Sequence, residues 1–391
     1  MSLPPQATDL TSKRAFQRTL VISDLHLGGS LGVDILRRPE NRAALKAELA
    51  GCDRLVLLGD TLELRHGPVR DVLGPALDAL SDIASALDPG CEVVVLAGNH
   101  DHALIAPWLD QRARSAKPSA LTAEQIVAAD SGWLPTLIAE AFTPANVVLA
   151  YPGIWLRDDV YAFHGHYLDR HIEIPTFERL AAGVMARITG RSPVDSVGPD
   201  DYEAVLGPMY AWAYALAQQA EGRGAQGAHG ASKRVWDVLS GASGHRPIRR
   251  RLASFGFAGA VGVLNLLKLG PLHREISPAR LRSAGIESAA AAAKGIRVSP
   301  DHLIYGHTHR PGPLSGDQAA EWLGSDGTQL WNSGSWVFEE HFLKGAKPGS
   351  PYWPGRVVEV LESGPPRIIS TLNDLSAAEI VGNMQPLDDL N

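Results

Sequence analysis

The chain has 391 residues, a length typical of one large domain or of two, since domains usually have about 100–200 residues. Apolar residues make up 45% and charged residues 20% of the sequence, which excludes a disordered, collagen-like or coiled-coil chain. The formal net charge of −7 gives no overall basic field, so the composition carries no strong nucleic-acid signal. The two cysteines, Cys52 and Cys91, are too few for a disulfide framework or a four-thiolate zinc site, and we expect both to be small buried residues.

No segment of the sequence predicts a signal peptide or a membrane span. Residues 1–18 lack an apolar stretch behind their basic residues. The longest nearly apolar run, Leu252–Leu267, has sixteen residues, whereas a span needs about 20. We therefore expect a soluble, cytoplasmic protein. Because Arg249–Arg251 precede this run and Lys268 follows it, two interpretations stay open: a peripheral membrane contact or acyl-chain groove, and a buried cap helix with a basic start.

Short runs of Val, Ile and Leu predict buried strands, and Ala/Leu-rich stretches with helical spacing predict helices between them. The N-terminal part alternates in this way, with strands expected at 19–23, 54–58 and 92–97 and helices at 42–50 and 72–87. This alternation favours an α/β fold with a parallel or mixed sheet. The last three strands of the chain lack long helices between them, which predicts a meander in a second sheet. The later strands are expected at 146–151, 160–163, 302–305, 329–331, 357–361 and 367–371.

The region 167–299 differs from the rest of the chain because it contains several helical patterns and a Gly-rich break at 221–230. We interpret it as a helical cap inserted into the α/β core. The expected organisation is an N-terminal tail at 1–18, a core at 19–166 and 300–375, the insertion at 167–299, and a C-terminal tail at 376–391.

Side chains of metal-ligand type follow five of the expected strands. Asp24, Gly59-Asp60 or His164 alone is more typical of a helix cap, a turn or a buried histidine. The pair His307 and His309 is a stronger signal, because residues i and i+2 of an extended backbone point the same way. The coincidence of such motifs at five strand ends indicates a site, because functional residues of open α/β sheets lie at the carboxyl ends of the strands. Carboxylate, amide and imidazole groups together suit two divalent cations. The motifs are Asp24-Leu25-His26, Gly59-Asp60, Gly98-Asn99-His100-Asp101, His164-Gly165-His166 and Gly306-His307-Thr308-His309.

This ordered set of motifs, over residues 19–310, resembles the calcineurin-like metallophosphoesterase superfamily. The resemblance implies an α/β fold with two packed β-sheets flanked by helices, an αββα sandwich that here carries the helical cap insertion. It also implies a dinuclear metal centre at the strand ends. Carried over by position, one metal is held by Asp24, His26 and His309, the other by Asn99, His164 and His307, and Asp60 bridges both.

The resemblance also implies roles for residues around the metals. His100 is expected to be catalytic, as general acid or charge stabiliser facing the scissile phosphate, with Asp101 orienting its ring. His166 is either a further ligand or a residue behind the ligands. The segment 332–335 resembles the closing turn that supports the metal loops. Candidates for substrate binding beside the motifs are Arg65, His66, His102, His166 and Arg310, for which surface exposure is an equally good interpretation.

A centre of this kind implies a metal-dependent hydrolase of phosphoric esters or anhydrides, because two cations can clamp phosphoryl oxygens and activate water for in-line attack. The ligand set suits Mn²⁺, Fe or Zn²⁺, and we expect manganese. We expect hydrolysis of a phosphodiester or pyrophosphate bond in a small molecule or amphiphile, such as a nucleotide-diphosphate or lipid-linked compound. The alternatives are a nuclease or cyclic-nucleotide phosphodiesterase and, outside the enzymes, a catalytically silent scaffold.

Finer features resemble the UDP-2,3-diacylglucosamine pyrophosphatase-like branch of the superfamily. They are the segments 23–27, 59–63 and 164–169 and a helical insertion after His164. The insertion is longer than in the best-known members of that branch, so the lipid substrate stays open. The signatures that mark protein Ser/Thr phosphatases, Asp-Arg-Gly after the second motif and Gly-Asn-His-Glu at the third, are absent from the sequence. The sequence indicates no oligomeric state.

Overall fold

The computed structural model describes residues 16–173, 177–190, 198–219, 278–339, 343 and 347–382 of the chain. The chain divides into two compact units, Met1–Gly165 with Ser299–Asn391 and His166–Val298. The expected Gly-rich break at 221–230 and the apolar run Leu252–Leu267 lie outside the described residues.

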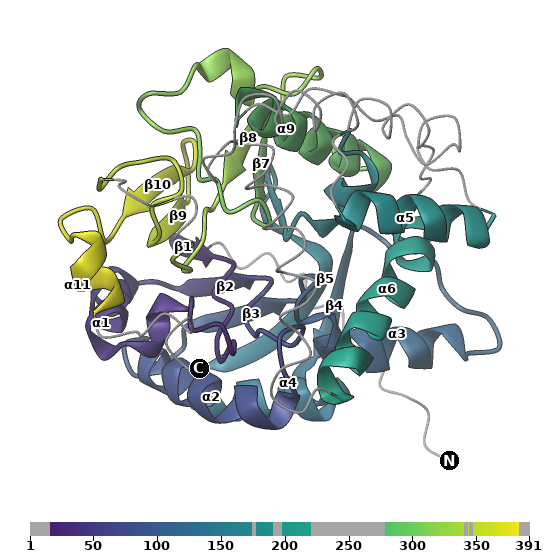
Figure 1. Ribbon diagram of the computed structural model, residues 1–391, viewed down its shortest axis with the longest axis horizontal. Helices are drawn as coiled ribbons and strands as arrows, with labels where there is room; N and C mark the ends of the chain where they lie inside the picture. The colour runs from purple at the N-terminus through teal and green to yellow at the C-terminus, as the bar shows by residue number, and fades with distance from the viewer. Residues whose placement is uncertain are drawn as a thin grey trace, which may run out of the picture. The chain divides into compact units, whose positions relative to one another are not determined.

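The described part of the first unit is built on one mixed sheet of ten strands (Figure 1). Nine of the ten described strands have four to six residues, and each of the first three has four of its five residues buried. The strands are β1 (Arg18–Ile22), β2 (Arg54–Leu58), β3 (Glu92–Leu96), β4 (Glu124–Ala128), β5 (Asn146–Arg157), β6 (Val160–Phe163), β7 (His302–Tyr305), β8 (Gln329–Asn332), β9 (Arg356–Leu361) and β10 (Arg367–Ser370).

The order of the strands is β10-β9-β1-β2-β3-β5-β6-β7-β8, and β4 pairs with β5 beside this path. The neighbours β1, β2, β3 and β5 are parallel, β6, β7 and β8 form a second parallel set, and antiparallel pairing of β5 with β6 joins the two sets. The α/β class with flanking helices is confirmed, and the two expected sheets are joined into one. The expected meander is wrong, because β8 lies at one edge of the sheet while β9 and β10 lie at the other, beside β1.

The length of β5 explains why the sheet is continuous. Its first half pairs with β3 up to Leu96, which is opposite Ala150, and its second half pairs with β6 from Phe163, which is opposite Gly153. The sequence predicts only the first half, because Gly after Pro152 is typical of a strand end. The carboxyl ends of β3 and β6 therefore meet at the middle of β5, although these two strands run in opposite directions. Loops from both parallel sets reach the same place.

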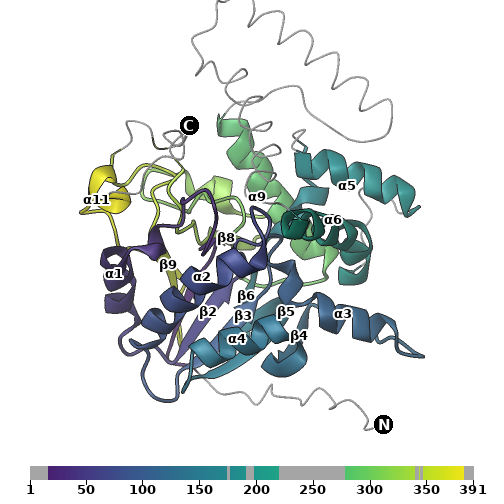
Figure 2. The same ribbon diagram turned by 60° about the horizontal axis from the view of Figure 1, so that its bottom comes forward.

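Helices cover one face of the first parallel set. Figures 1 and 2 show α1 (Pro39–Leu49), α2 (Val69–Ala84) and α4 (Trp133–Ala141) along this face. In α2, the buried residues Val72, Ala76, Ala79, Leu80 and Ile83 lie at positions i, i+4, i+7, i+8 and i+11, as expected for an amphipathic helix on a sheet.

The core of the first unit lies inside the curled sheet. One buried cluster joins Val56 and Val94 of the first parallel set to Ala162 and Ile304 of the second. The two halves of the sheet therefore pack on each other as the halves of a sandwich would, while remaining hydrogen-bonded through β5. Strand β4 is not predicted by the sequence pattern, because its five residues are mostly only partly buried and form no apolar run.

The described part of the predicted C-terminal tail, residues 376–382, contains a helix, which corrects the prediction for these residues. Helix α11 (Ala377–Val381) begins at Ser376 with a complete capping box formed with Glu379. The side chains of Arg38 and Asn41 each donate a hydrogen bond of 2.9 Å to the Ile380 carbonyl, which attaches α11 to the start of α1. The remaining short elements of the unit are α3 (Ala106–Ala113), η1 (Ile35–Arg37), η2 (His102–Leu104), η3 (Ala129–Ser131) and η5 (Ala319–Trp322).

The described part of the second unit is helical. It contains η4 (His166–Arg170), α5 (Phe177–Ile188), α6 (Pro199–Gln219) and α9 (Pro278–Gly295). Residues of η4 pack against α6, where the rings of Tyr167 and Tyr202 stack at 4.4 Å and His171 Nε2 lies 2.6 Å from the Tyr202 hydroxyl. Within the described ranges of the whole chain, no helix combines the length and the apolar character that crossing a membrane requires.

Candidate metal centre

The loops that follow β1 and β2, and those that follow β6 and β7, are tied together in pairs by backbone hydrogen bonds. Side-chain carboxylates join the other loops: Asp60 accepts from His100 N of the loop after β3, and Asp24 accepts from His307 N. His26 N donates to Asp60 O and Leu27 N to Thr61 O, both at 2.9 Å, so the loops after β1 and β2 run side by side. Gly306 N donates to His164 O at 2.8 Å, which joins the loops after β6 and β7. The side chains of these loops consequently gather in one place.

One group of side chains combines Asp24, His26 and His309, and its three potential ligand atoms lie within 4.8 Å of one another. His309 Nε2 is 3.3 Å from both Asp24 Oδ1 and His26 Nε2. Asp24 and His26 are buried, whereas the His309 side chain is 18% exposed. A carboxylate with two imidazoles is a donor set suited to a divalent transition metal.

A second group combines Asp60, His164 and His307 within the same 4.8 Å limit, and Asn99 joins it. His164 Nε2 lies 3.3 Å from Asp60 Oδ2. The Asn99 amide lies 3.0 Å from His307 Nδ1 and 3.3 Å from His164 Nε2. This group therefore brings together one carboxylate, one amide and two imidazoles.

The Asp60 carboxylate lies between the two groups. Its Oδ2 atom is 3.3 Å from His164 Nε2 and 3.8 Å from His26 Nε2, while its Oδ1 atom accepts a 2.7 Å hydrogen bond from the backbone N–H of His100. Asp60 thus occupies the position expected of a bridging ligand. All seven side chains that the sequence predicts as ligands lie in these two groups or between them. That they bind metal stays a prediction.

Two buried polar atoms of the site fit a cation. Asp24 Oδ1 is buried and, among the described residues, has no donor in good hydrogen-bond geometry, although His309 Nε2 lies 3.3 Å away. With its oxygen turned inward, as a metal ligand requires, the Asn99 amide meets Asp60 Oδ2 at 3.1 Å, so two acceptors face each other. A divalent cation in each group would satisfy both atoms, since carboxylate and amide oxygens are ligands of such ions.

The backbone of the ligands is strained. Six described residues other than glycine have positive φ angles, a conformation that costs roughly 1–2 kcal/mol because Cβ approaches the following carbonyl. Such strain is concentrated at functional sites, where the surrounding structure imposes it. Five of the six are predicted ligands: Asp24 (55°), His26 (48°), Asp60 (51°), His307 (66°) and His309 (57°).

Glycines in the motifs leave room for ligands that other motifs contribute. A Cβ atom on Gly98 would collide with the Asp60 carboxylate, and one on Gly306 would lie 2.5 Å from Asp24 Oδ2. The Gly-Asn and Gly-His pairs of the motifs are therefore explained by close approach between neighbouring loops.

The charges of the site stabilise one another. Burial alone would raise the pKa of Asp24, but the imidazoles of His309 and His164 outweigh it and lower that pKa to about 2. Burial would likewise raise the pKa of Asp60, yet His164, His100 and His26 lower it well below its usual value. Conversely, burial would lower the pKa of His164, but the Asp60 carboxylate raises it to about 9. Without metal, protons on the rings therefore balance the carboxylates.

The carboxylate that contacts the His100 ring belongs to Glu63, and the expectation that Asp101 orients this ring is wrong. Asp101 does not orient the His100 ring, because its carboxylate is turned beneath the loops and accepts backbone hydrogen bonds from Gly98 and Thr61, each of 2.7 Å. The backbone N–H groups of Asp60 and Leu62, on either side of Thr61, donate longer hydrogen bonds to Asp101, of 3.3 and 3.2 Å. His100 Nδ1 instead lies 2.8 Å from Glu63 Oε2.

Two glutamates lie behind the ligand rings. Glu63 Oε2 is 2.8 Å from His26 Nδ1, and Glu339 Oε1 is 3.2 Å from His309 Nδ1. His164 Nδ1 meets the Leu58 carbonyl at 2.8 Å. Such outer contacts fix the tautomer and orientation of metal-binding histidines. Glu63 could have been found from its place three residues after Asp60, whereas no motif marks Glu339.

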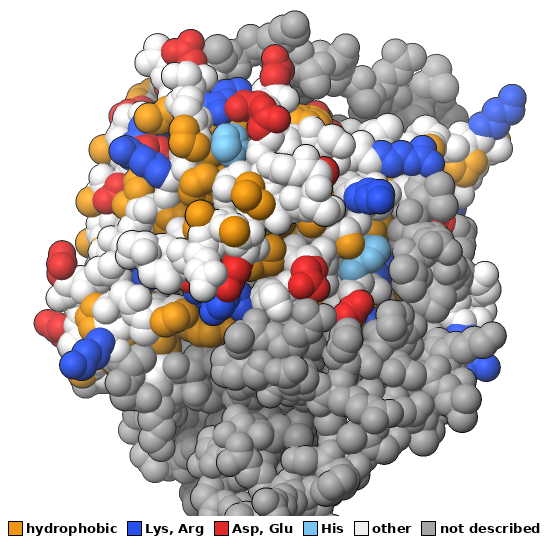
Figure 3. All heavy atoms as spheres, turned by 90° about the horizontal axis from the view of Figure 1, so that it is seen from above, with side chains coloured by type: hydrophobic (Ala, Val, Ile, Leu, Met, Phe, Trp, Pro, Cys, Tyr) orange, Lys and Arg blue, Asp and Glu red, His pale blue; other side chains and the backbone are white. Residues whose placement is uncertain are grey.

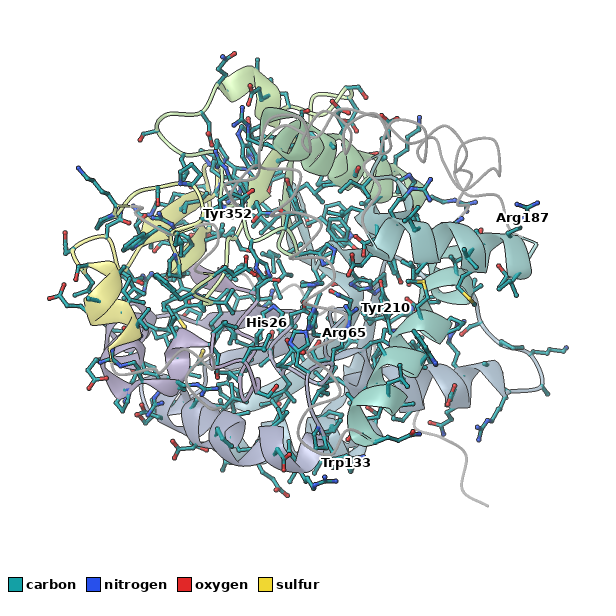
Figure 4. The ribbon with its side chains drawn as sticks, viewed as in Figure 1. His26, Arg65, Trp133, Arg187, Tyr210 and Tyr352 are labelled. Atoms are coloured by element: carbon teal, nitrogen blue, oxygen red, sulfur yellow. The ribbon has the colours of Figure 1, made fainter. Side chains whose placement is uncertain are left out.

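Of the candidates for substrate binding, Arg65 lies at the metal centre, near His26 as labelled in Figure 4, with Nη1 2.8 Å from the Asn99 amide. The expectation that Arg310 binds substrate or is exposed is corrected, because its guanidinium is buried and pairs with the Asp317 carboxylate at 2.9 and 2.5 Å. His102 is buried and packs edge-on against Tyr151 at 6.1 Å. His66 lies behind the ligands, 3.2 Å from Glu63. His166 belongs to the second unit, where its ring packs against Tyr167 and Tyr210.

The segment after β8 supports the ligand loops, as its resemblance to a closing turn implies. Ser333 Oγ is 2.7 Å from Ser23 Oγ, which donates to Asp24 Oδ2 at 2.5 Å. Asn332 Nδ2 donates to the Gly306 carbonyl at 2.9 Å. The orientation of the Asp24 carboxylate therefore depends on this segment.

Comparison with known families gives a match over half of the chain. The model of a family described as calcineurin-like phosphoesterase matches residues 17–212, just over half of the chain. The match includes four of the five ligand-bearing loops, and the fifth lies C-terminal to it. No curated protein has a significant match to the chain.

Proposed function

Because the chain belongs to the calcineurin-like phosphoesterase family, whose members are in general metal-dependent phosphoester hydrolases, we propose that it hydrolyses a phosphodiester or pyrophosphate bond at this centre. The observation that carries the proposal is the place of Asp60, whose Oδ2 lies within 3.8 Å of imidazole nitrogens of both ligand groups. A carboxylate shared in this way is what a two-metal site needs to keep its ions at a fixed spacing.

Each of the two ligand groups would bind one metal ion. The first group would hold one ion and the second the other, with Asp60 common to both. Two divalent ions there would supply Lewis-acid charge to the phosphoryl oxygens and to the attacking water. Manganese is our choice, because oxygen and imidazole donors are mixed in both groups.

Two side chains at the centre are suited to contact the substrate. Arg65 carries a permanent charge, which suits it to a second phosphoryl group. His100 would hydrogen-bond to the leaving oxygen. Burial lowers the pKa of His100 to about 3, although Glu63 and Asp60 oppose that effect, so the free ring is neutral near pH 7. The negative charge of a bound phosphate would raise this pKa.

A small or amphiphilic substrate is favoured over nucleic acid. The net charge is −7, and on the face shown in Figure 3 acidic and basic side chains of the described residues are interspersed with hydrophobic ones. A nuclease would need a continuous basic surface to hold a polyanion. We therefore propose a nucleotide-diphosphate or lipid-linked substrate of the kind cleaved by UDP-diacylglucosamine pyrophosphatases, in a cytoplasmic protein. Contact with membrane through Leu252–Leu267 stays a prediction.

The test is hydrolysis of three compounds in the presence of Mn²⁺: bis-p-nitrophenyl phosphate, p-nitrophenyl phosphate and a UDP-linked acylglucosamine. Preference for the last supports a lipid pyrophosphatase, and cleavage of the diester alone supports a phosphodiesterase of another substrate. The Asp60→Asn variant is the control, because it removes the charge between the ligand groups and should lose activity by at least about 100-fold. Absence of turnover with every metal would favour a scaffold.

A further inference from the structure

The two cysteines of the chain lie side by side in the first unit. Cys52 lies two positions before β2 and Cys91 directly before β3, and these strands are parallel neighbours in the sheet. Their Sγ atoms are 3.6 Å apart, although the residues are separated by 39 positions in the sequence. Both residues are buried, as the sequence predicts, each with 2% of its surface exposed. The fold therefore brings two distant thiols into contact.

The turns that carry the cysteines are fixed to each other. The backbone N–H of Gly51 donates a 3.1 Å hydrogen bond to Asp88 Oδ2, and that of Cys91 donates one of 3.0 Å to the Asp88 carbonyl. Glu92 N then donates to the Asp53 carbonyl at 2.9 Å, where the pairing of β2 with β3 begins. Closing the 3.6 Å between the sulfur atoms to the length of a disulfide bond, about 2.05 Å, is therefore a local movement.

The surface lies next to the pair. The residues before the two cysteines, Gly51 and Gly90, are exposed. A Cβ atom added to either glycine would meet no atom within 4 Å beyond the adjoining residues. Each buried cysteine is thus one position along the chain from exposed backbone, which favours a small oxidant such as hydrogen peroxide over a bulky one.

The two thiols differ in their readiness to ionise. The hydrogen bond from the Cys52 thiol lowers the pKa of Cys91, opposed by burial and assisted by the backbone N–H of Leu55. The same contact and burial both raise the pKa of Cys52. Because the thiolate is the nucleophilic form of cysteine, Cys91 is suited to react first and Cys52 to react with the product.

We infer that Cys52 and Cys91 are a dithiol that hydrogen peroxide oxidises to a disulfide across the starts of β2 and β3. The Cys91 thiolate attacks one peroxide oxygen and the O–O bond breaks. The departing hydroxide takes up the proton that Cys91 had released and becomes water, which leaves a sulfenic acid on Cys91. The Cys52 sulfur then attacks the Cys91 sulfur, and the S–O bond breaks as the second oxygen leaves as water with the Cys52 proton. The two thiols lose two electrons, which reduce the peroxide to water.

The dithiol is separate from the metal centre. The cysteines precede β2 and β3, whereas Asp60 and Asn99 follow these strands. Extended chain rises about 3.3 Å per residue, so the length of both strands lies between the sulfur atoms and the ligands. The disulfide would tie the two strands together without using a ligand residue, and the inference does not rest on the proposed function.

The experiment treats the folded full chain with hydrogen peroxide in a buffer whose chelator keeps free metal ions from reacting. Thiols are then alkylated in denaturant, and the masses of the chain and of its peptides are measured. We expect both thiols to be lost together and a peptide pair joined through Cys52 and Cys91, which dithiothreitol separates. Thiols that stay free, or oxidation to sulfinic and sulfonic acids without a cross-link, would overturn the inference.

Two matched variants test the order of the steps. Cys52→Ser keeps a hydroxyl that can donate to Cys91, so a sulfenic acid should accumulate on Cys91, where dimedone traps it. Cys91→Ser should give about tenfold less adduct on Cys52, the effect of one unit of pKa on the amount of thiolate. An equal or larger yield on Cys52 would contradict the assigned order. If a serine variant does not fold, alanine at the same position replaces it.

Thermal unfolding gives an independent readout. A cross-link over 39 residues restricts the unfolded chain, so the oxidised chain should melt about 5 °C or more above the reduced chain. Both serine variants should melt at the same temperature with and without peroxide, which controls for oxidation of the methionines. A cross-linked chain that melts at or below the reduced chain would show that the bond does not fit the fold, and the inference would fail.

Discussion

The left-handed backbone at the ligands has a cost that the free protein bears without metal. At His307, with φ of 66°, every residue that carries a Cβ atom is strained. The ring of His307 is partly exposed and contacts His164 and Asn99, so its loss leaves little buried surface unfilled. This position therefore permits a measurement of strain separately from packing.

We expect His307→Gly to be more stable than His307→Ala by about 1 kcal/mol, because both remove the ring and only alanine keeps the Cβ atom. At an ordinary helix or strand position the sign is opposite, with glycine less stable by about 0.5–1 kcal/mol. Urea unfolding of the two metal-free variants gives the difference. Alanine as the more stable of the two would show that the loop relaxes and carries no strain.

At the scale of elements, Asp101 joins the loops that follow β2 and β3. The buried carboxylate accepts backbone hydrogen bonds from Gly98 on one loop and from Asp60, Thr61 and Leu62 on the other. Its role is therefore structural, and it differs from that of the adjacent His100, whose ring contacts Glu63.

The same substitution at the two adjacent positions should separate these roles. Asp101→Asn places an amide NH₂ among backbone donors and should lower the free energy of unfolding by about 2–3 kcal/mol. His100→Asn should change stability by less than about 1 kcal/mol and lower kcat. Chemical denaturation and steady-state kinetics of both variants check this. A larger loss of stability at position 100 would contradict the assignment.

The parts of the fold that the sequence predicts are those with a local signal. The strands before the five motifs are predicted within a residue or two, because each is an apolar run that ends in a ligand-bearing loop. The second half of β5 is not predicted, since Pro152-Gly153 is typical of a strand end. The edge position of β8 depends on pairing between distant segments, and no local pattern reports it.

The candidate site follows the same rule. Seven ligand candidates are found from motifs at strand ends, and the structure brings them together. The partner of His100 is missed because adjacency in sequence favours Asp101, whereas a carboxylate from another loop, Glu63, has the reach. Glu339 lies 30 residues beyond His309, so only the fold reveals their contact.

For the molecule as a whole, proton and metal compete for the same atoms. The Asp60 carboxylate outweighs burial and raises the pKa of His164 to about 9. In the metal-free protein this pair stabilises the fold fully below the usual histidine value of 6.5 and loses that contribution as the pH rises through about 9. A metal ion must displace the proton, so metal affinity has the opposite dependence on pH.

We expect Mn²⁺ affinity to fall about tenfold for each unit of pH lowered from 8 to 6, for each proton displaced. Isothermal titration at three pH values, in buffers of different ionisation enthalpy, measures both the affinity and the protons released. Asp60→Asn should flatten the dependence, because it removes the charge that holds the proton on His164. An affinity that is independent of pH would show that the rings are neutral before the metal binds.

The pairing of β6 with β7 has a consequence for how such a protein can diversify. These strands are parallel neighbours, with Val160 opposite His302, and the whole of the second unit, His166–Val298, is the connection between them. A parallel crossover needs only about a dozen residues, and the entropy of closing a loop grows slowly with its length. The chain can therefore exchange, shorten or enlarge this connection over evolutionary time while His164 and His307 stay at adjacent strand ends. The second unit can therefore change in evolution, and the substrate specificity with it, while the ligand residues of the first unit are kept.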